Sequence, residues 1–126
     1  MNLIISPTHT CFDDALDLLV ALLRQNQGRR RTLRLVHGIV LAGGSRLWAH
    51  AWLQEGDTVF FSGIVDGEKS YFQGSRAEYY AEIQVQEHTS YTVAMALEHN
   101  RTSGHYGPWK ARYLALCGHG GRRRRA

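Results

Sequence analysis

Two residues in this chain have side chains suited to covalent catalysis, Cys11 and His50. Cys11 stands at the start of an apolar segment with helical spacing, where the positive end of a helix dipole stabilises a thiolate. His50 lies in the segment Ala49-His50-Ala51-Trp52, which predicts a strand. A histidine held against a cysteine can remove and return the thiol proton. The two residues therefore predict a nucleophile and its base, provided that folding brings them into hydrogen-bond range.

A third polar group is expected to orient the imidazole, and the strand that follows His50 should supply it. Three residues are candidates: Ser62 just past that strand, Asp57 in the turn before it, and Asp66 in the turn Asp66-Gly67. Both aspartates are also ordinary turn-forming residues. The sequence leaves the choice among the three open.

Two tryptophans and one threonine are predicted to contact a substrate. Trp48 and Trp52 share a strand face with His50, because strand side chains alternate with a period of two. Burial between them would keep the imidazole neutral, which is the form that a base requires. Thr10 directly precedes Cys11 and could join the first helix amides in holding an oxyanion.

The same residues also have a purely structural interpretation. A lone cysteine in an apolar helix is commonly an inert core residue. Asp13 and Asp14 follow Cys11 closely, and their charges would raise the pKa of its thiol if they pointed inward. The reactive interpretation of Cys11 and that of His50 depend on each other.

Metal and cofactor binding find little support in the sequence. His99, His105, Cys117 and His119 are spread through the last third of the chain with no compact ligand spacing. Gly43-Gly44 lacks the lysine and the helix of a phosphate-binding loop. We predict neither a metal nor a cofactor.

Hydrophobic periodicity and turn signals predict an α+β fold, in which an N-terminal helix carrying Cys11 packs on an antiparallel sheet. No element is assigned to residues 68–73. A helix over 91–99 would take Thr89 or Ser90 as its cap. The remaining expected elements are a helix over 11–26, strands over 32–42, 47–53, 58–61 and 83–87, and a short helical or irregular piece over 74–80.

Length and charge indicate one domain over residues 1–117 and a flexible basic tail over 118–126. The formal charge of +4 comes largely from Arg29–Arg31 and Arg122–Arg125. These clusters lack interleaved aromatic residues, so they favour a solvated surface over nucleic-acid binding. No run approaches the ~18 apolar residues of a membrane span, and no signal peptide is recognisable. We expect a cytoplasmic protein without a membrane partner.

Several segments resemble compact papain-like and transglutaminase-like cysteine proteins, among them small bacterial and phage members and the leader peptidases of lasso-peptide biosynthesis. The resemblance rests on Cys11 opening a helix, the strand Leu35-Val36-His37-Gly38-Ile39-Val40, the segment His50-Ala51-Trp52 and the ending Ser103-Gly104-His105-Tyr106-Gly107-Pro108-Trp109. It implies a papain-like core with Cys11 as nucleophile and His50 as base. The family usually places an aspartate where this chain has Ser62, and an asparagine where it has Asp14. Serine offers no charge to stabilise an imidazolium.

The sequence therefore predicts a cysteine hydrolase that acts on a peptide or amide bond. One alternative is a catalytically inactive papain-like module that binds a partner, which the serine at position 62 motivates. A second alternative is a basic protein associated with nucleic acid, which the arginine clusters motivate.

Overall fold

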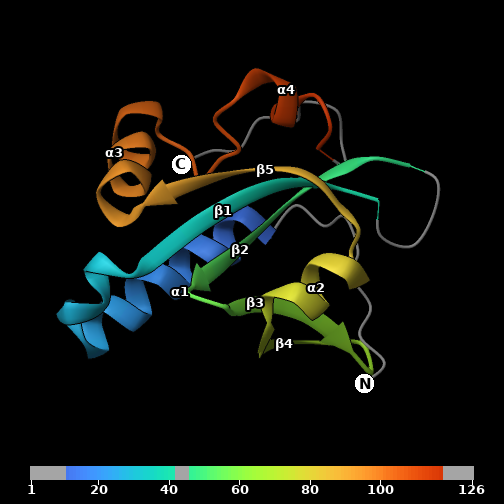
Figure 1. The fold of residues 1–126 in the computed structure, drawn as a ribbon. Helices are drawn as coiled ribbons and strands as arrows, with labels where there is room; N and C mark the ends of the chain where they lie inside the picture. Colours follow the sequence, from blue (N-terminus) through green and yellow to red (C-terminus); the bar gives the residue numbers. More distant parts are fainter. Residues whose placement is uncertain (1–10, 42–45, 118–126) are drawn as a thin grey trace.

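A five-stranded antiparallel sheet with helices around it makes up the structure, a computed structural model that describes residues 11–41 and 46–117 (Figure 1). The helices are α1 (Cys11–Gln25), the short 3-10 helix η1 (Gln27–Arg31), α2 (Arg76–Glu82), α3 (Val93–Ser103) and α4 (Ala111–Leu114). The strands lie in the order β4-β3-β2-β1-β5 and comprise β1 (Leu33–Val40), β2 (Trp48–Glu55), β3 (Thr58–Val65), β4 (Glu68–Ser75) and β5 (Val85–Thr92). The predicted α+β class, with a Cys11-bearing helix on an antiparallel sheet, is confirmed.

Helix α1 forms because its apolar residues recur at helical spacing. Phe12, Leu16, Leu19 and Leu23 are all buried and line the face that packs against the sheet. Acidic residues in the first turn and Arg24 in the last turn match the helix dipole. This packing holds the first residue of the helix against the middle of the sheet.

Alternation along the strands divides the core into two clusters, one on each face of the sheet. The cluster with α1, which we call the α1 cluster, takes Leu35 and Ile39 from β1 and Ala49, Ala51 and Leu53 from β2. The cluster on the other face, the α2 cluster, takes the intervening residues of the same strands together with Tyr79 of α2. Its buried members are Val36, Val40, Trp48, Trp52, Val59, Phe61, Tyr79 and Ile83.

Strand β4 is an element that the sequence pattern does not predict. Most of its side chains are exposed, because it lies at the edge of the sheet, and Phe72 is the side chain that packs against the α2 cluster. Burial on one face is what produces an alternating hydrophobic pattern, so this strand carries none. A two-residue turn joins it to β3, with Asp66 and Gly67 at φ of 53° and 79°.

Two further boundaries differ from those expected. Helix α3 begins at Val93, and its cap is Thr92. The Thr92 hydroxyl accepts a hydrogen bond of 3.2 Å from the Met95 amide. The expected caps, Thr89 and Ser90, therefore do not cap this helix. Strand β5 continues to Thr92, so the expected strand over 83–87 was too short. The predicted tail over 118–126 lies outside the described residues. No helix in the described ranges is long and apolar enough to cross a membrane.

Candidate functional site

Cys11 is the first residue of α1, as predicted, but its thiol is enclosed in the core. Its exposed fraction is 4%, and the main chain of Ala51 on β2 hydrogen-bonds the thiol. Burial raises the pKa of this thiol to about 12; the hydrogen bond from Ala51 lowers it, and the nearby Cys117 and Asp14 each raise it by a smaller amount. The thiol is therefore protonated at neutral pH, and a protonated thiol is a poor nucleophile.

His50 lies on β2 among aromatic rings. Its ring centroid is 5.5 Å from that of Trp48 and 5.8 Å from that of Trp52. Its Nε2 lies 2.9 Å from the hydroxyl oxygen of Tyr79, while Nδ1 has no hydrogen-bond partner among the described residues. Burial lowers the pKa of His50 to about 4, so the imidazole is neutral, as the sequence predicted.

The structure does not bring the thiol and this imidazole into hydrogen-bond contact. Cys11 belongs to the α1 cluster and is bonded to Ala51, whereas the rings around His50 belong to the α2 cluster. Ala51 and His50 are consecutive residues of one strand, so their side chains project to opposite faces of the sheet. The hydrogen bond expected between Cys11 and His50 is therefore not found among the described residues, where the two side chains pack in different clusters.

None of the three residues proposed to orient His50 contacts its ring. The Ser62 hydroxyl instead donates a long hydrogen bond of 3.5 Å to Asp14 on α1. Asp57 lies in the turn beyond the far end of β2, where its carbonyl oxygen accepts from the Arg76 amide at 2.7 Å. Asp66 lies in the β3–β4 turn. The group that does bind His50 is Tyr79 on α2, which sequence reasoning missed because nothing local marks an aromatic residue as a partner of a distant strand.

The residues predicted to contact substrate are found in different settings. Trp48 and Trp52 are 4% and 0% exposed and pack in the α2 cluster, so they are core residues. Trp52 also reaches the wall of a surface pocket. Thr10 lies outside the described residues.

His37 is a second buried histidine, and it was not singled out from the sequence. Its ring lies 4.8 Å from Phe12, 5.0 Å from Trp109 and 5.1 Å from Tyr91, measured between centroids. It stands opposite Ala51 in the β1–β2 register and so shares the α1 face of the sheet with Cys11. Neither of its ring nitrogens has a hydrogen-bond partner among the described residues, so His37 does not serve the thiol as a base either. Burial, with a smaller contribution from His99, lowers its pKa to about 3.

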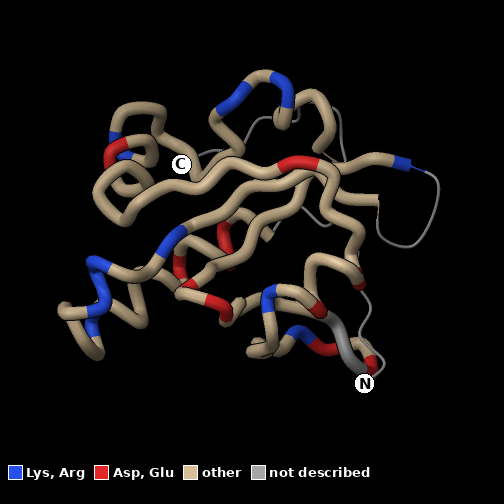
Figure 2. Tube along the Cα trace, in the orientation of Figure 1, with Lys and Arg blue, Asp and Glu red and all other residues tan. Residues whose placement is uncertain are grey.

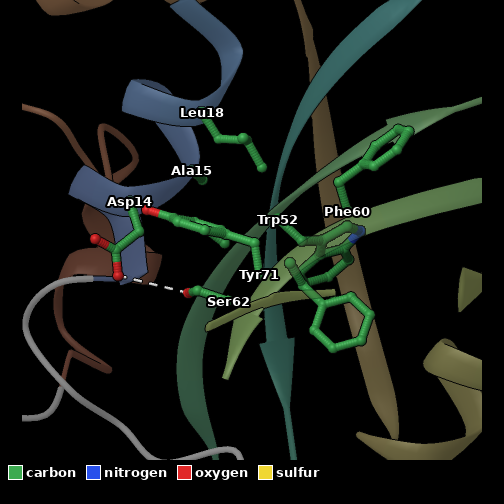
Figure 3. Close-up of a pocket in the computed structure, with 9 residues that line it drawn as sticks. Asp14, Ala15, Leu18, Trp52, Phe60, Ser62 and Tyr71 are labelled. Carbon is green, nitrogen blue, oxygen red and sulfur yellow. Dashed lines mark hydrogen bonds between the residues drawn. The ribbon is translucent and has the colours of Figure 1, made fainter. Parts of the chain in front are cut away.

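A narrow pocket opens between α1 and the β3–β4 hairpin (Figure 3). Asp14 and Ser62 meet on one side of it, and Tyr71 extends from β4 toward α1 beside Asp14. Lys69, also on β4, places its Nζ atom 2.8 Å from Oδ1 of Asp14. The pocket is lined by Asp14, Ala15, Leu18, Ala51, Trp52, Phe60, Phe61, Ser62 and Tyr71.

Charge is distributed over several separate parts of the surface (Figure 2). Of the cluster Arg29–Arg31, Arg29 is engaged by Glu55 at 2.6 Å, and the Glu55 pKa is lowered chiefly by that hydrogen bond. Arg112 is likewise paired with Glu87 at 2.9 Å. No group of three or more metal-ligating side chains occurs in the part of the chain that the structure describes.

Comparison with protein-family models, with curated proteins and with solved structures finds no match for this chain. The geometry of the described residues is therefore what distinguishes among the functions that the sequence suggested.

Proposed function

We propose that this protein is a peptide-binding module on an α+β scaffold, and that Cys11 does not act as a nucleophile in the folded chain. The observation that carries the proposal is the position of Cys11 and His50 on opposite faces of β2. A thiol with a pKa of about 12, and with no basic partner among the described residues, lacks both features that activate a cysteine.

The edge of the sheet beside the pocket supports peptide binding. In the two-residue β3–β4 hairpin, Val65 and Glu68 flank the turn as the first hydrogen-bonded pair. Alternation then directs the main-chain groups of Lys69, Tyr71 and Gln73 away from β3, and no described strand lies beyond β4. An extended peptide can add to such an edge, while a pocket beside it receives one side chain.

The first prediction concerns the reactivity of the thiol. We expect iodoacetamide to label Cys11 in the folded Cys117→Ser variant at least 100-fold more slowly than in the same variant unfolded in urea. At pH 8 a pKa of about 12 leaves a thiolate fraction of about 10⁻⁴, and burial limits access further. Mass spectrometry of quenched samples measures both rates. Labelling at pH 6 that outpaces a model thiol would reject the proposal.

The second prediction concerns binding. Selection of displayed random peptides on the immobilised full chain should enrich a common sequence pattern. We expect Cys11→Ala to bind the enriched peptides with an unchanged Kd and Tyr71→Ala to bind them at least tenfold more weakly. Met95→Ala is the matched control, since Met95 is similarly exposed, 47% against 51%, but lies on α3. Absence of any enriched pattern, or equal loss in the Tyr71 and Met95 variants, contradicts peptide binding at this pocket.

The cysteine hydrolase is a second candidate, favoured by one observation. Cys11 opens a 15-residue helix, and its thiol is bonded to the main chain of the residue next to His50. In that function His50 would take the proton of Cys11, the thiolate would form a thioester with the acyl carbon, and His50 would return the proton to the leaving nitrogen. Water would then hydrolyse the thioester, and Tyr79 would orient the imidazole throughout. The reaction requires a rearrangement that brings the two side chains to one face of β2.

The hydrolase has its own test, in which a Tyr79 variant is compared with a Ser62 variant. Because Tyr79 is the group that binds His50, Tyr79→Phe should shift the pH profile of any hydrolytic rate, while Ser62→Ala should not. Peptide cleavage that persists in Cys11→Ala, or a profile that responds to neither variant, would exclude this mechanism.

A further inference from the structure

We propose that Cys11 and Cys117 form a reversible disulfide, which ties the end of the described chain to the first residue of α1. The chain has two cysteines, and both are free thiols in this structure. The inference is independent of peptide binding, since neither cysteine lines the pocket beside β4. It gives a role to a buried thiol that the proposed function does not use.

The edge of β2 that faces away from β1 brings the two residues together. The Ala49 amide donates a hydrogen bond of 3.0 Å to the carbonyl oxygen of Leu116, and the main chain of Ala51 hydrogen-bonds the Cys11 thiol. Ala49 and Ala51 are two residues apart in one strand, so these main-chain groups point the same way and lie about 7 Å apart. Cys117 follows Leu116 directly. The start of α1 and the last described residues therefore occupy neighbouring positions along one strand edge.

Packing and electrostatics place the two thiols close to each other. Both belong to the α1 cluster, Cys11 as a buried member and Cys117 as a half-buried residue packed against it. Burial is the main cause of the raised pKa of Cys11, and among the neighbouring ionisable groups Cys117 raises it most, ahead of Asp14. Asp14 stands only three residues further along the same helix. Because the influence of a charge falls with distance, the sulfur of Cys117 lies near that of Cys11.

Cys117 is also the residue that can be reached and moved. Its side chain is half-buried, whereas Cys11 is 4% exposed, so a small oxidant meets Cys117 first. A disulfide needs Cβ atoms about 3.8 Å apart. Cys117 is the last described residue, its amide bonds the Leu114 carbonyl oxygen at 3.2 Å, and a glycine follows it in the sequence. The adjustment that closes the bond therefore falls on this end of the chain.

The oxidant that we propose is a low-molecular-weight disulfide, RSSR, such as oxidised glutathione. Cys117 loses its proton, and the thiolate attacks one sulfur of RSSR, which gives a mixed disulfide and releases RS⁻. Cys11 then loses its proton, and its sulfur attacks that of Cys117 and releases a second RS⁻. The two RS⁻ take up two protons, so RSSR is reduced to two RSH while the chain loses two hydrogen atoms. The high pKa of Cys11 slows the second step, and its position beside Cys117 offsets this.

The experiment equilibrates the full chain with reduced and oxidised glutathione at pH 8, once in native buffer and once in urea. Intact mass spectrometry of acid-quenched samples counts each product. At one glutathione ratio, we expect the ratio of internal disulfide to dithiol to be at least 100-fold higher in native buffer. The fold holds together two residues that are far apart along the unfolded chain. Equal ratios in the two conditions, or a native product that stops at one glutathione on Cys117, overturn the proposal.

Two variants assign the product. In native buffer Cys11→Ala should stop at one glutathione on Cys117, because the second thiol is missing. Cys117→Ser should stay unmodified, because Cys11 is enclosed. Loss of two hydrogen atoms in the wild type, together with these two results, identifies the internal bond. Glutathione on Cys11 of folded Cys117→Ser, at the rate seen for Cys117 in the wild type, contradicts the proposed order of attack.

Stability provides a second readout that does not depend on trapping a product. A bond that closes a long loop constrains the unfolded chain, so oxidation should raise the urea midpoint of the wild type by at least about 1 M. Cys117→Ser, treated in the same way, is the matched control, and its midpoint should not change. A midpoint that stays the same or falls on oxidation would show that the folded chain does not hold the two sulfurs in place for the bond, and the proposal would be rejected.

Discussion

Lowering the pH from 7 to 4.5 is expected to reduce the free energy of unfolding by about 5 kcal/mol, through two buried histidines. The pKa of His37 is about 3 and that of His50 about 4 in the folded chain, against 6.5 for a free histidine. Between these values the unfolded chain binds a proton at each site and the folded chain does not. Stability is therefore complete above pH 6.5 and is lost as the pH falls. Each histidine contributes about 2.5 kcal/mol to this loss, because pH 4.5 lies about 2 units below the pKa in the unfolded chain and one pKa unit corresponds to about 1.4 kcal/mol.

Urea denaturation at pH 7 and at pH 4.5 measures this loss. His37→Leu and His50→Gln should each recover about half of it, since each removes one titrating ring; glutamine can keep a hydrogen bond to Tyr79. His88→Gln is the control, because His88 is exposed on β5 and should leave the loss unchanged. Because the pKa of Glu55 is lowered in the folded chain, most of the stability lost on protonating Glu55 is lost below pH 4.5. A loss that is the same in all three variants would show that the two buried rings are not its source.

Local patterns predicted those parts of the fold that bury one face. The spacing of Leu16, Leu19 and Leu23 was sufficient for α1, and the alternation around His50 was sufficient for β2. Strand β4 was missed for the converse reason, since most of its side chains are exposed. A periodic hydrophobic pattern arises where one face of an element is buried, so an edge strand with few buried side chains shows little of it.

The candidate site shows where local reasoning stops. Sequence position correctly placed Cys11 at a helix start and His50 beside Trp48 and Trp52. Whether the two residues meet depends on which face of β2 the helix covers. The face that α1 covers depends on the packing of all the apolar side chains of β2. Ala49, Ala51 and Leu53 pack against α1, and the two tryptophans pack on the opposite face. The alternation along β2 predicts which of its residues share a face, but it does not predict which face α1 covers.

Gly38 is a glycine inside a predicted strand, and its position could have predicted a close contact at that point. A glycine inside a strand commonly marks the close approach of another group. Here it pairs with His50 across the β1–β2 ladder, and the indole of Trp52 lies directly over its Cα atom. The position of both Trp52 and His50 on the α2 face therefore depends on the missing side chain at residue 38.

Gly38→Ala is accordingly expected to lower the free energy of unfolding by about 3 kcal/mol, the upper part of the range for overpacked cores. A Cβ atom at this position would lie 2.5 Å from Cη2 and 2.9 Å from Cζ3 of Trp52, with the Glu87 carbonyl oxygen at 3.3 Å. Trp52 is 0% exposed, so its ring has no solvent to move into. Urea denaturation at pH 7 measures the change. Gly74→Ala is the matched control, since its Cβ would meet only Phe61 at 3.9 Å, and it should change stability by less than about 0.5 kcal/mol.

A double-mutant cycle identifies the indole as the cause. Trp52→Phe shortens the ring that covers residue 38, so adding Gly38→Ala to it should cost under about 1 kcal/mol, a coupling of about 2 kcal/mol. Because the ring of Trp52 also contacts His50, relief of the clash should restore the His50 resonances that Gly38→Ala displaces. If Gly38→Ala costs the same in both backgrounds, the strain arises in the backbone of β1, and Trp52 does not fix the arrangement of this face of the sheet.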